Sequence, residues 1–399
     1  MSEDAQPTGS VRPLKIAMVG YAFMGAAHSQ AWRNVHRFFP LDVTPEMSVL
    51  VGRNADAVAQ AAHTMGWAET ATDWRAVVGR DDIDVVDVCT PGDTHAEIAI
   101  AALEAGKHVL CEKPLANTLA EAEEMTAAAD AARARGVRSM VGFTYRRVPA
   151  VTLMKQMISE GAVGEIRHIR GLYLQDWIID PEFPLVWRLQ KDKAGSGALG
   201  DVGAHLLDMA QFDTGQSLTG VAAQTETFIK QRPISESIGG EGGRLAASGG
   251  TQMGEVTVDD AAIVLARTDG GALATFEATR FATGRKNRIV LEVNGSAGSL
   301  VFNFENMNYL EHYDLALGDR AGFNRIQVTE ATHPYVDAWW PPGHGLGYEH
   351  GFVNQARDFL AAISAGEDPT PSFADGTQIQ RLLAAVETSA VAQAAWTTV

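Results

Sequence analysis

The chain has 399 residues, a length that exceeds one ordinary hydrophobic core and predicts two domains. Its formal net charge of −17 argues against nucleic acid and anionic membrane surfaces as partners, because both contacts need clustered Lys and Arg. The two cysteines, Cys89 and Cys111, lie in apolar runs, as reduced core residues of a cytoplasmic protein do. The sequence predicts no secretory leader, no membrane span and no metal site.

The first predicted strand begins at Lys15 and runs into a glycine turn, after a lead at 1–13 that we expect to be disordered. A helical pattern follows the turn through Trp32. Strand, glycine turn and helix together are the setting of a dinucleotide site, where free N–H groups at the helix start face a pyrophosphate. Alanine replaces the middle glycine of the usual pattern, which narrows the approach to phosphate. The candidate cofactor contacts in this turn are Gly20, Ala22, Phe23, Met24 and Gly25.

The second predicted strand, at 47–51, ends at Gly52-Arg53-Asn54. An NAD-specific site usually offers an acidic residue to the ribose 2′-hydroxyl at this point, and the strand end carries none. Arg53 is able to contact a 2′-phosphate or to stack on adenine, which favours NADP. A solvated arginine on a turn is an equally simple interpretation.

Two further strands end in residues suited to a ligand edge, because parallel strands bind ligands at their carboxyl ends. Strand 84–89 leads to Thr90-Pro91, and strand 107–111 leads to Glu112-Lys113-Pro114. We expect these four strand-end residues, Thr90, Pro91, Glu112 and Lys113, and also His95 to lie near the cofactor, although packing or capping explains His95 as well. Strands that alternate with helices up to residue 145 predict a doubly wound parallel sheet, a Rossmann domain, over 14–145.

After residue 145 the pattern changes to strands joined by tight glycine turns, which predicts a mostly antiparallel sheet. The domain at 146–399 is therefore expected to be α/β with a large open sheet. Its polar, glycine-rich stretch at 233–255 predicts a mobile insertion, and its C-terminal helices are free to pack back on the Rossmann domain. The strands are expected near 166–174, 220–230, 257–267, 272–280, 287–295 and 299–304, and the helices at 150–160, 347–364 and onward from about 377 to Trp396.

The segment Gly195–Asp208 is the most informative stretch of this second domain. A glycine-rich bend leads into a helix in which Asp201 and His205 are four residues apart, so both lie on one face. A carboxylate beside an imidazole orients the ring and favours its charged form, and such a pair is a candidate proton acceptor for an alcohol. The alternative is a capping Asp201 with an unrelated histidine.

Glu112-Lys113-Pro114 and the Gly195–Asp208 segment together resemble the Gfo/Idh/MocA family of NAD(P)-dependent sugar and polyol oxidoreductases, from about Lys15 to Trp396. Within the family, Tyr173-Leu-Gln-Asp-Trp177 and Gly195-Ser-Gly-Ala-Leu-Gly200 resemble a levoglucosan-dehydrogenase-type subgroup. The resemblance implies a Rossmann domain, an open-sheet domain, and often a homodimer or homotetramer through that sheet. The choice between NAD and NADP stays open, because the subgroup points to NAD and Arg53 to NADP.

The resemblance also implies a catalytic set of Lys113, Asp201 and His205. His205 would take the hydroxyl proton of a sugar or cyclitol as hydride leaves its carbon. Lys113 would stabilise the reacting oxygen, and Asp201 would orient the substrate or His205. The three catalytic residues would also contact the substrate, and motif position adds four candidates for the substrate wall, Tyr145, Arg146, Gln175 and Trp187.

Two other functions remain possible at this point. Some relatives hold NAD tightly, oxidise a glycoside transiently, eliminate the aglycone and return the hydride, with no net redox change. Others are non-catalytic dinucleotide sensors that regulate a partner protein. Such sensors usually lose the catalytic residues, and the presence of Lys113, Asp201 and His205 argues against that role.

Overall fold

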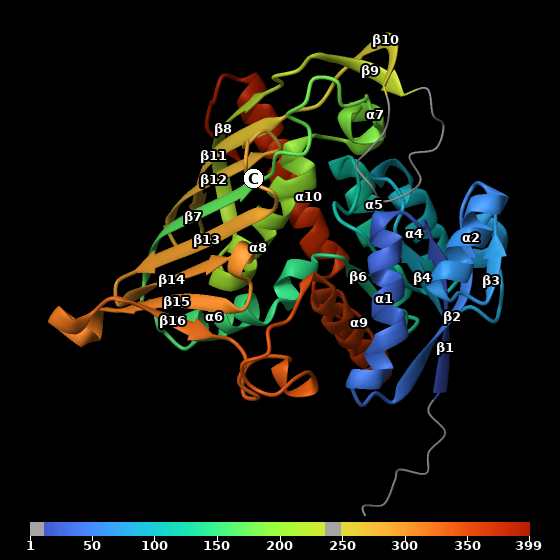
Figure 1. The fold of residues 1–399 in the computed structure, drawn as a ribbon, viewed down its shortest axis with the longest axis horizontal. Helices are drawn as coiled ribbons and strands as arrows, with labels where there is room; N and C mark the ends of the chain where they lie inside the picture. The colour runs from blue at the N-terminus through green and yellow to red at the C-terminus, as the bar shows by residue number, and fades with distance from the viewer. Residues whose placement is uncertain (1–11, 236–248) are drawn as a thin grey trace, which may run out of the picture.

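The computed structural model describes residues 12–235 and 249–399 (Figure 1). The predicted lead lies outside this part of the chain except for Arg12 and Pro13. These two residues open the first strand instead, because Arg12 pairs with Val43 in the sheet. No helix within the described residues is long and apolar enough to cross a membrane.

The N-terminal sheet has six parallel strands in the order β3-β2-β1-β4-β5-β6. Strand order reverses between β1 and β4, and this reversal creates the crevice in which doubly wound folds bind nucleotides. Its strands are β1 (Arg12–Val19), β2 (Val43–Val51), β3 (Glu69–Ala71), β4 (Val85–Val88), β5 (His108–Cys111) and β6 (Ser139–Val141). Its helices are α1 (Phe23–Phe38), α2 (Ala55–Met65), α3 (Trp74–Val78), α4 (His95–Glu104) and α5 (Leu119–Arg133).

The C-terminal sheet has nine strands in the order β16-β15-β14-β13-β7-β12-β11-β8-β17. Within the described ranges, β7 and β12 are the one parallel pair of this sheet, so the predicted α/β architecture with a mostly antiparallel open sheet is confirmed. The strands are β7 (Ile166–Leu174), β8 (Leu218–Glu226), β11 (Ala261–Thr268), β12 (Leu273–Thr279), β13 (Arg288–Gly295), β14 (Gly298–Asn303), β15 (Tyr309–Asp314), β16 (Phe323–Gln327) and β17 (Thr397–Thr398). The helices are α6 (Pro149–Ser159), α7 (Lys191–Ala194), α8 (Ala204–Thr214), α9 (Tyr348–Ala365) and α10 (Phe373–Val391).

Two local predictions in this domain differ from the structure. The last helix ends at Val391 rather than at Trp396, because Gln393 and Ala394 adopt positive φ values of 55° and 65° and turn the chain into β17. The flanks of the predicted mobile insertion form a hairpin of β9 (Gln231–Ser235) and β10 (Gly249–Glu255). The rest of that insertion lies outside the described residues.

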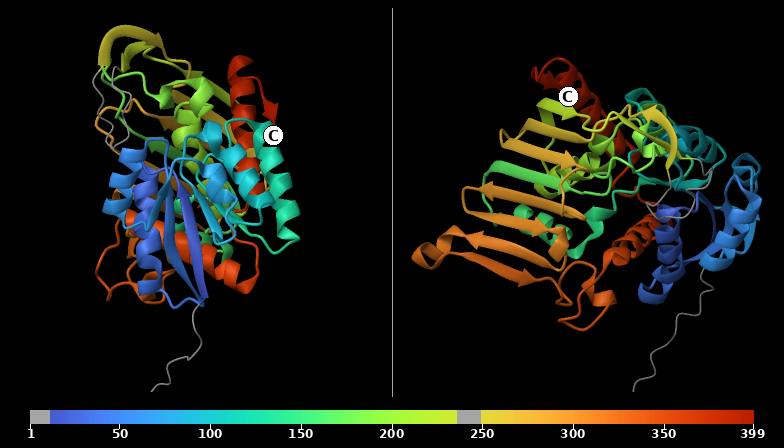
Figure 2. Two further views of the ribbon diagram at one scale, coloured as in Figure 1. Left: turned by 90° about the vertical axis from the view of Figure 1, so that its right-hand side faces the viewer. Right: turned by 45° about the horizontal axis from the view of Figure 1, so that its top comes forward.

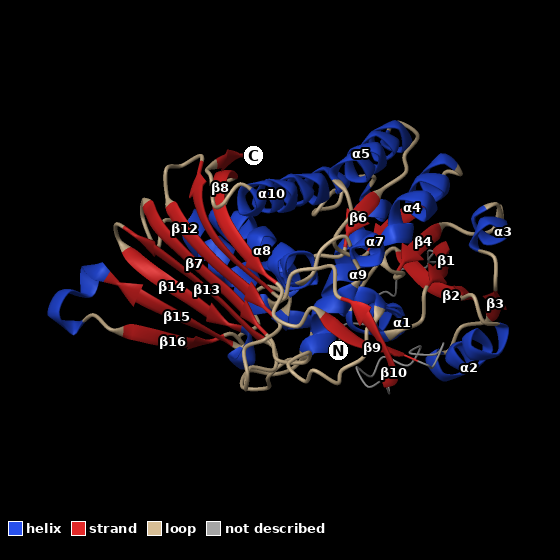
Figure 3. Cartoon of the chain, turned by 90° about the horizontal axis from the view of Figure 1, so that it is seen from above, coloured by secondary structure: helices blue, strands red, loops and turns tan. Residues whose placement is uncertain are grey.

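Among the residues that the structure describes, helices cover one face of the large sheet and leave the other face open (Figures 2 and 3). Helices α6, α8 and α10 pack on its inner face. Strand β11 alternates accordingly: Val264 and Ala266 are buried, while Ile263 and Leu265 are exposed on the other face. The alternation is that of a sheet with one core face and one open face.

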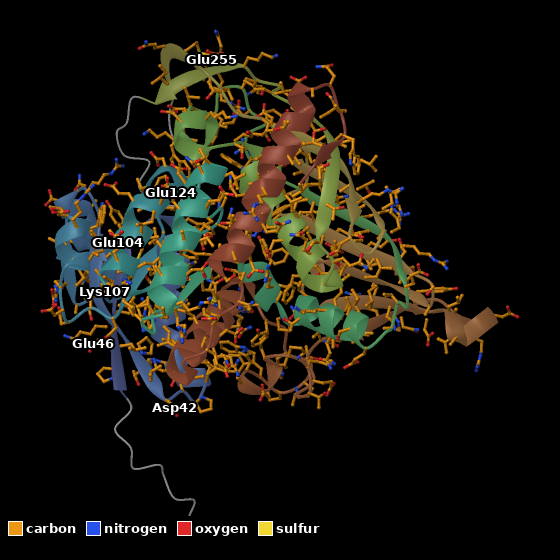
Figure 4. The ribbon with its side chains drawn as sticks, turned by 180° about the vertical axis from the view of Figure 1, so that it is seen from behind. Asp42, Glu46, Glu104, Lys107, Glu124 and Glu255 are labelled. Atoms are coloured by element: carbon orange, nitrogen blue, oxygen red, sulfur yellow. The ribbon has the colours of Figure 1, made fainter. Side chains whose placement is uncertain are left out.

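The two domains are joined by the C-terminal helices as well as by the chain itself. Helix α9 packs against α1, and α10 packs against α5 (Figures 1 and 3). Phe352 and Phe359 of α9 share a hydrophobic core with Leu14 of β1. The rest of the Rossmann surface carries many of the charged side chains, including the exposed Glu46, Glu104 and Glu124 (Figure 4).

Candidate active site

A cleft of about 560 Å³ opens between the two domains at the carboxyl ends of the parallel strands. Both domains line it, which is the usual place for a ligand site in such folds. Most of the predicted site residues meet there, namely Ala22, Phe23, Met24, Thr90, Pro91, His95, Glu112, Lys113, Tyr145, Gln175, Trp187, Asp201 and His205.

The glycine turn at the Rossmann end of the cleft fits a dinucleotide. Gly20 has φ 103°, and a Cβ there would lie 2.6 Å from the Cys89 carbonyl oxygen. A Cβ on Gly25 would lie 2.3 Å from the Gly20 carbonyl, so both positions require glycine. Ala22 precedes α1 without a side-chain cap, which leaves the first N–H groups of α1 available to a phosphate.

The tip of β2 carries no carboxylate, as the sequence predicts. Arg53 is exposed there and does not line the cleft. Asn54 is engaged in capping α2, since its Oδ1 accepts the Ala57 N–H at 3.0 Å. Arg53 remains a candidate contact for the adenosine part of a dinucleotide.

His95 has a structural role, in agreement with the packing alternative that the sequence left open. Its Nδ1 lies 3.0 Å from the Pro114 carbonyl oxygen and its Nε2 lies 2.8 Å from the Thr90 carbonyl oxygen. The ring therefore ties the ends of β4 and β5 together behind the cofactor end of the cleft.

Glu112 contacts the buried His28, which the sequence analysis did not select as a candidate site residue. His28 Nε2 lies 2.9 Å from Glu112 Oε1, and His28 Nδ1 lies 3.0 Å from both oxygens of Asp87. Burial opposes a charge on His28, but Asp87 raises the pKa of the ring well above its ordinary value. This imidazolium between two carboxylates fixes the residue that precedes Lys113.

Lys113, Asp201, His205 and Arg280 form what we call the charged cluster. Lys113 Nζ donates to the backbone carbonyl of Asp201 at 2.8 Å and lies 3.6 Å from Asp201 Oδ1. Arg280 is fully buried, and its Nη1 lies 3.5 Å from Asp201 Oδ2. The cluster thus joins the end of β5, the segment before α8 and the end of β12.

The pKa values of both acid–base groups of the charged cluster, Asp201 and His205, are lowered. Burial alone would raise the pKa of Asp201, but Lys113, Arg280 and Arg188 lower it to about 2. Burial and the charge of Lys113 lower the pKa of His205 well below its ordinary value. Asp201 is therefore a carboxylate and His205 a neutral imidazole near neutral pH, which a proton acceptor must be.

Asp201 does not favour a charged His205 as the sequence predicts, because burial and Lys113 outweigh its effect on the pKa of the ring. No hydrogen bond among the described residues joins the two side chains, and His205 Nδ1 is buried without a hydrogen-bond partner. The reason is local: Asp201 lies in a π-helical turn, η4 (Leu199–Gly203), and its extra residue breaks the α-helical stacking at a spacing of four. His205 is held instead by the Tyr145 ring, 4.6 Å away between centroids.

Asp259 holds this turn in place from the neighbouring sheet. Its carboxylate accepts the N–H groups of Gly197 and Leu199, both at 2.7 Å. A Cβ on Gly197 would lie 1.7 Å from the Asp259 carbonyl oxygen, so this approach requires glycine. The glycine-rich bend is therefore needed to bring Asp201 up to Lys113.

A second group of side chains on the cleft wall, which we call the amide network, comprises Tyr145, Tyr173, Gln175, Trp177 and Asn287. The Tyr145 and Tyr173 hydroxyls lie 2.9 Å apart, and Tyr173 donates to Asn287 Oδ1 at 2.7 Å. Gln175 Nε2 donates to the same oxygen at 2.8 Å, and Trp177 Nε1 donates to Gln175 Oε1 at 3.0 Å. These contacts link three distant segments of the chain, around residues 145, 173–177 and 287.

Arg146 does not reach the cleft, contrary to the prediction. Its Nε and Nη2 donate to the two oxygens of Asp208 at 2.8 and 2.5 Å, and both side chains are buried. A guanidinium removed from water needs such a partner, and α8 supplies it one turn beyond His205. Arg146 therefore ties the segment before α6 to α8.

Sequence reasoning missed several residues that line the cleft, namely Tyr173, Trp177, Arg188, Arg280, Asn287, Phe304 and Tyr348. Arg188 adjoins the predicted Trp187, and that neighbour was the available signal. Arg280 and Asn287 follow β12 and precede β13, and strand ends on that side of the sheet face the cleft. No sequence pattern distinguishes these two positions from ordinary loop residues.

A Rossmann domain, a dinucleotide turn and a charged cluster in one cleft define a dinucleotide-dependent oxidoreductase. Residues 14–143 match the model described as oxidoreductase family, NAD-binding Rossmann fold, and residues 151–301 match the GFO/IDH/MocA C-terminal domain. The chain belongs to the GFO/IDH/MocA family of oxidoreductases, as its motifs predicted.

Relatives with known structures cover nearly the whole chain. Levoglucosan dehydrogenase of Pseudarthrobacter phenanthrenivorans is 43% identical over 386 residues, which cover 96% of this chain and 97% of that protein. An oxidoreductase domain protein from Kribbella flavida is 60% identical with a TM-score of 0.91, over 97% of this chain and 99% of the other. A levoglucosan dehydrogenase in complex with NADH and levoglucosan is 41% identical with a TM-score of 0.89 and the same coverage.

Proposed function

We propose that this chain is an NAD-dependent dehydrogenase that oxidises a secondary hydroxyl of a sugar, with an anhydrosugar such as levoglucosan as its first candidate substrate. The observation that carries the proposal is the charged cluster, which presents an ammonium and a neutral imidazole in one cleft beside a dinucleotide turn. The levoglucosan dehydrogenase relative supports both the cofactor and the substrate.

Each member of the charged cluster has a separate task in this proposal. Oxidised nicotinamide, when bound, accepts a hydride from the substrate carbon. His205 takes the hydroxyl proton, because its lowered pKa keeps it neutral and ready to accept. Lys113 donates to the reacting oxygen and stabilises its growing negative charge, which is worth about 3–4 kcal/mol for one well-placed donor.

Asp201 acts through Lys113 in this scheme rather than through His205. Its carboxylate and its backbone carbonyl both contact Lys113, so it sets the direction of the ammonium. Arg280 keeps that carboxylate ionised from the other side. Tyr145 packs on His205 and limits the ring to one orientation.

The direct test follows reduced nicotinamide by absorbance after purified protein is mixed with NAD or NADP and one sugar. The panel holds levoglucosan, glucose, myo-inositol and a glucoside. We expect reduced cofactor with NAD and levoglucosan. Sugar consumption without reduced cofactor, with dinucleotide released on denaturation, would replace the dehydrogenase by the redox-neutral glycoside reaction. A protein that binds no dinucleotide would overturn both.

We also propose that two or four copies assemble through the open face of the large sheet. Ile263, Leu265 and Leu273 are 63, 40 and 37% exposed on this face, an apolar surface that a second copy of the sheet would cover. Light scattering should give a dimer or tetramer for the wild type. Ile263→Lys should lower the mass of the assembly, and an unchanged mass would remove this face from the contact.

The cytoplasm is the compartment that we propose for this chain. Cys89 and Cys111 are buried free thiols, and burial raises the pKa of both. Thiols of this kind persist in a reducing compartment. Cell fractionation with an antibody against the chain tests this directly.

A further inference from the structure

The amide network has a fixed hydrogen-bond direction, and Trp177 sets it. An indole N–H can only donate, so the Gln175 atom that faces Trp177 at 3.0 Å must be the amide oxygen. The Gln175 NH₂ group then points the other way, to Asn287. The orientation of the Gln175 amide therefore follows from Trp177, whose N–H can act only as a donor.

The same reasoning fixes Asn287. Gln175 Nε2 donates at 2.8 Å to the Asn287 side-chain atom that faces it, so that atom must be the acceptor Oδ1. The Tyr173 hydroxyl donates to the same oxygen at 2.7 Å. The Asn287 NH₂ group forms a hydrogen bond with the Tyr145 hydroxyl, which opposes the rise that burial causes in the pKa of Tyr145. An NH₂ group has two hydrogens, and across residues 12–235 and 249–399 no second partner of Asn287 Nδ2 is present, while Asn287 lines the cleft.

The other hydrogens of the network are already in use. Because the Tyr173 hydrogen points to Asn287, the Tyr145 hydroxyl must donate to the Tyr173 oxygen at 2.9 Å. The second Gln175 hydrogen faces the same Tyr173 oxygen at 3.4 Å. Tyr145 in turn packs on His205 with 4.6 Å between ring centroids, so the network and the candidate base share one wall.

We propose that Asn287 determines substrate specificity by donating from its side-chain NH₂ to an acceptor oxygen of the sugar. The acceptor is a ring or bridging ether oxygen or a hydroxyl oxygen. Arg188 lines the same cleft and also offers only donors. The wall therefore selects sugars with oxygen at this position and rejects an ammonium group, so amino sugars should bind poorly. The inference rests on the proposed function.

Asn287→Asp is the sharpest variant. A carboxylate keeps the size of the side chain and still accepts from Tyr173 and Gln175, but it replaces the NH₂ donor by an acceptor. Sugar affinity is measured by titrating levoglucosan into the enzyme–NADH complex, in which no hydride can move. We expect the affinity to fall roughly 10–100-fold, because a donor becomes an acceptor against the sugar oxygen. NADH affinity should stay within about twofold, since the dinucleotide turn is untouched.

Two matched variants separate the effect of hydrogen-bond direction in the amide network from the effect of side-chain packing. Trp177→Phe removes the donor that fixes Gln175, so both amides can reverse, and sugar affinity should fall about 2–5-fold. Tyr173→Phe removes one donor to Asn287 but leaves the other, Gln175 Nε2, to fix the amide, so affinity should fall less than in Trp177→Phe. A purely structural role predicts the opposite order, because Tyr173 is buried and Trp177 is only half-buried.

Wild-type affinity in Asn287→Asp would overturn the inference. If that variant does not bind NADH and is therefore misfolded, Trp177→Phe decides, and wild-type sugar affinity there overturns the inference as well. Wild-type protein that binds none of the sugars overturns the proposed function and the inference with it. This outcome is distinct from failure of the inference alone, because the wild-type protein itself would then bind no sugar.

Discussion

The charged cluster and the amide network occupy one cleft but are held by different forces. The Asp201 carboxylate lies 3.6 Å from Lys113 Nζ and 3.5 Å from Arg280 Nη1, distances at which charges attract without a fixed direction. The one directional bond between Asp201 and Lys113 goes to the Asp201 backbone carbonyl, at 2.8 Å. Asn287 and Tyr173 are joined at 2.7 Å, within directional hydrogen-bond geometry. The difference suggests a division of labour, in which charges respond to the transition state and neutral hydrogen bonds recognise the substrate.

The largest expected effect comes from the base of the charged cluster. His205→Asn should lower kcat by roughly 10²–10⁴-fold, because the variant lacks the imidazole that accepts the hydroxyl proton. In the wild type, kcat should fall as pH drops through the pKa of His205, and this midpoint should lie below 6.5, the ordinary histidine value.

The pH profile of the variant provides the control for this prediction. The acidic limb should disappear in His205→Asn, because the titrating base is gone. If kcat of His205→Asn still falls at low pH as in the wild type, another residue accepts the proton. The charged cluster would then not contain the base.

Loss of the ammonium should have the next largest effect. Lys113→Met should lower kcat by about 100-fold or more, since one donor to the developing negative charge is removed. Dinucleotide affinity, measured by NADH fluorescence, should be preserved. Lys191→Met is the matched control, because Lys191 is an exposed lysine that pairs with Glu387. Equal losses in the two variants would contradict a role for Lys113 in chemistry.

Removal of Arg280, the second cation of the charged cluster, should lower kcat by an intermediate amount. Arg280→Gln takes away a charge that keeps the pKa of Asp201 at about 2, so that pKa should rise toward its ordinary value. We expect kcat to fall about tenfold, because the Asp201 carboxylate loses one of the cations that hold it beside Lys113. Arg280→Lys should recover part of the rate. If Arg280→Lys is as slow as Arg280→Gln, Arg280 acts through its packing rather than through its charge.

The smallest effect on kcat should come from the amide network. Tyr173→Phe should lower kcat by no more than about fivefold, because a neutral hydrogen bond contributes only about 1 kcal/mol. Steady-state kinetics at saturating sugar measures this directly. A loss of 100-fold would move Tyr173 into the chemistry and erase the distinction between the two groups.

The sequence allowed prediction of those features that depend on neighbouring residues. Gly20 and Lys113 lie at the ends of strands whose apolar runs are plain, so their position at the ligand edge followed from local pattern. His205 was predicted from the glycine-rich bend before its helix and from the family resemblance. The lack of a hydrogen bond between His205 and Asp201 could not be predicted, because one extra residue in a π turn leaves no mark on a helical pattern.

Features that depend on distant segments were out of reach. Arg146 was expected in the cleft, and only the packing of α8 turns it toward Asp208. Asn287 and Arg280 acquire their positions from strands far apart in sequence, β7, β12 and β13. A single sequence carries no signal for which loop residues such strands bring together.

One measurement tests the division of labour most directly: the rate of hydride transfer and the dissociation constant of the sugar, determined by stopped-flow in Lys113→Met and Asn287→Asp. We predict that Lys113→Met slows hydride transfer by about 100-fold or more and leaves sugar affinity within about threefold. Asn287→Asp should weaken sugar binding by at least about tenfold and leave the transfer rate within about threefold. Variants that lose rate and affinity in equal proportion would contradict the account.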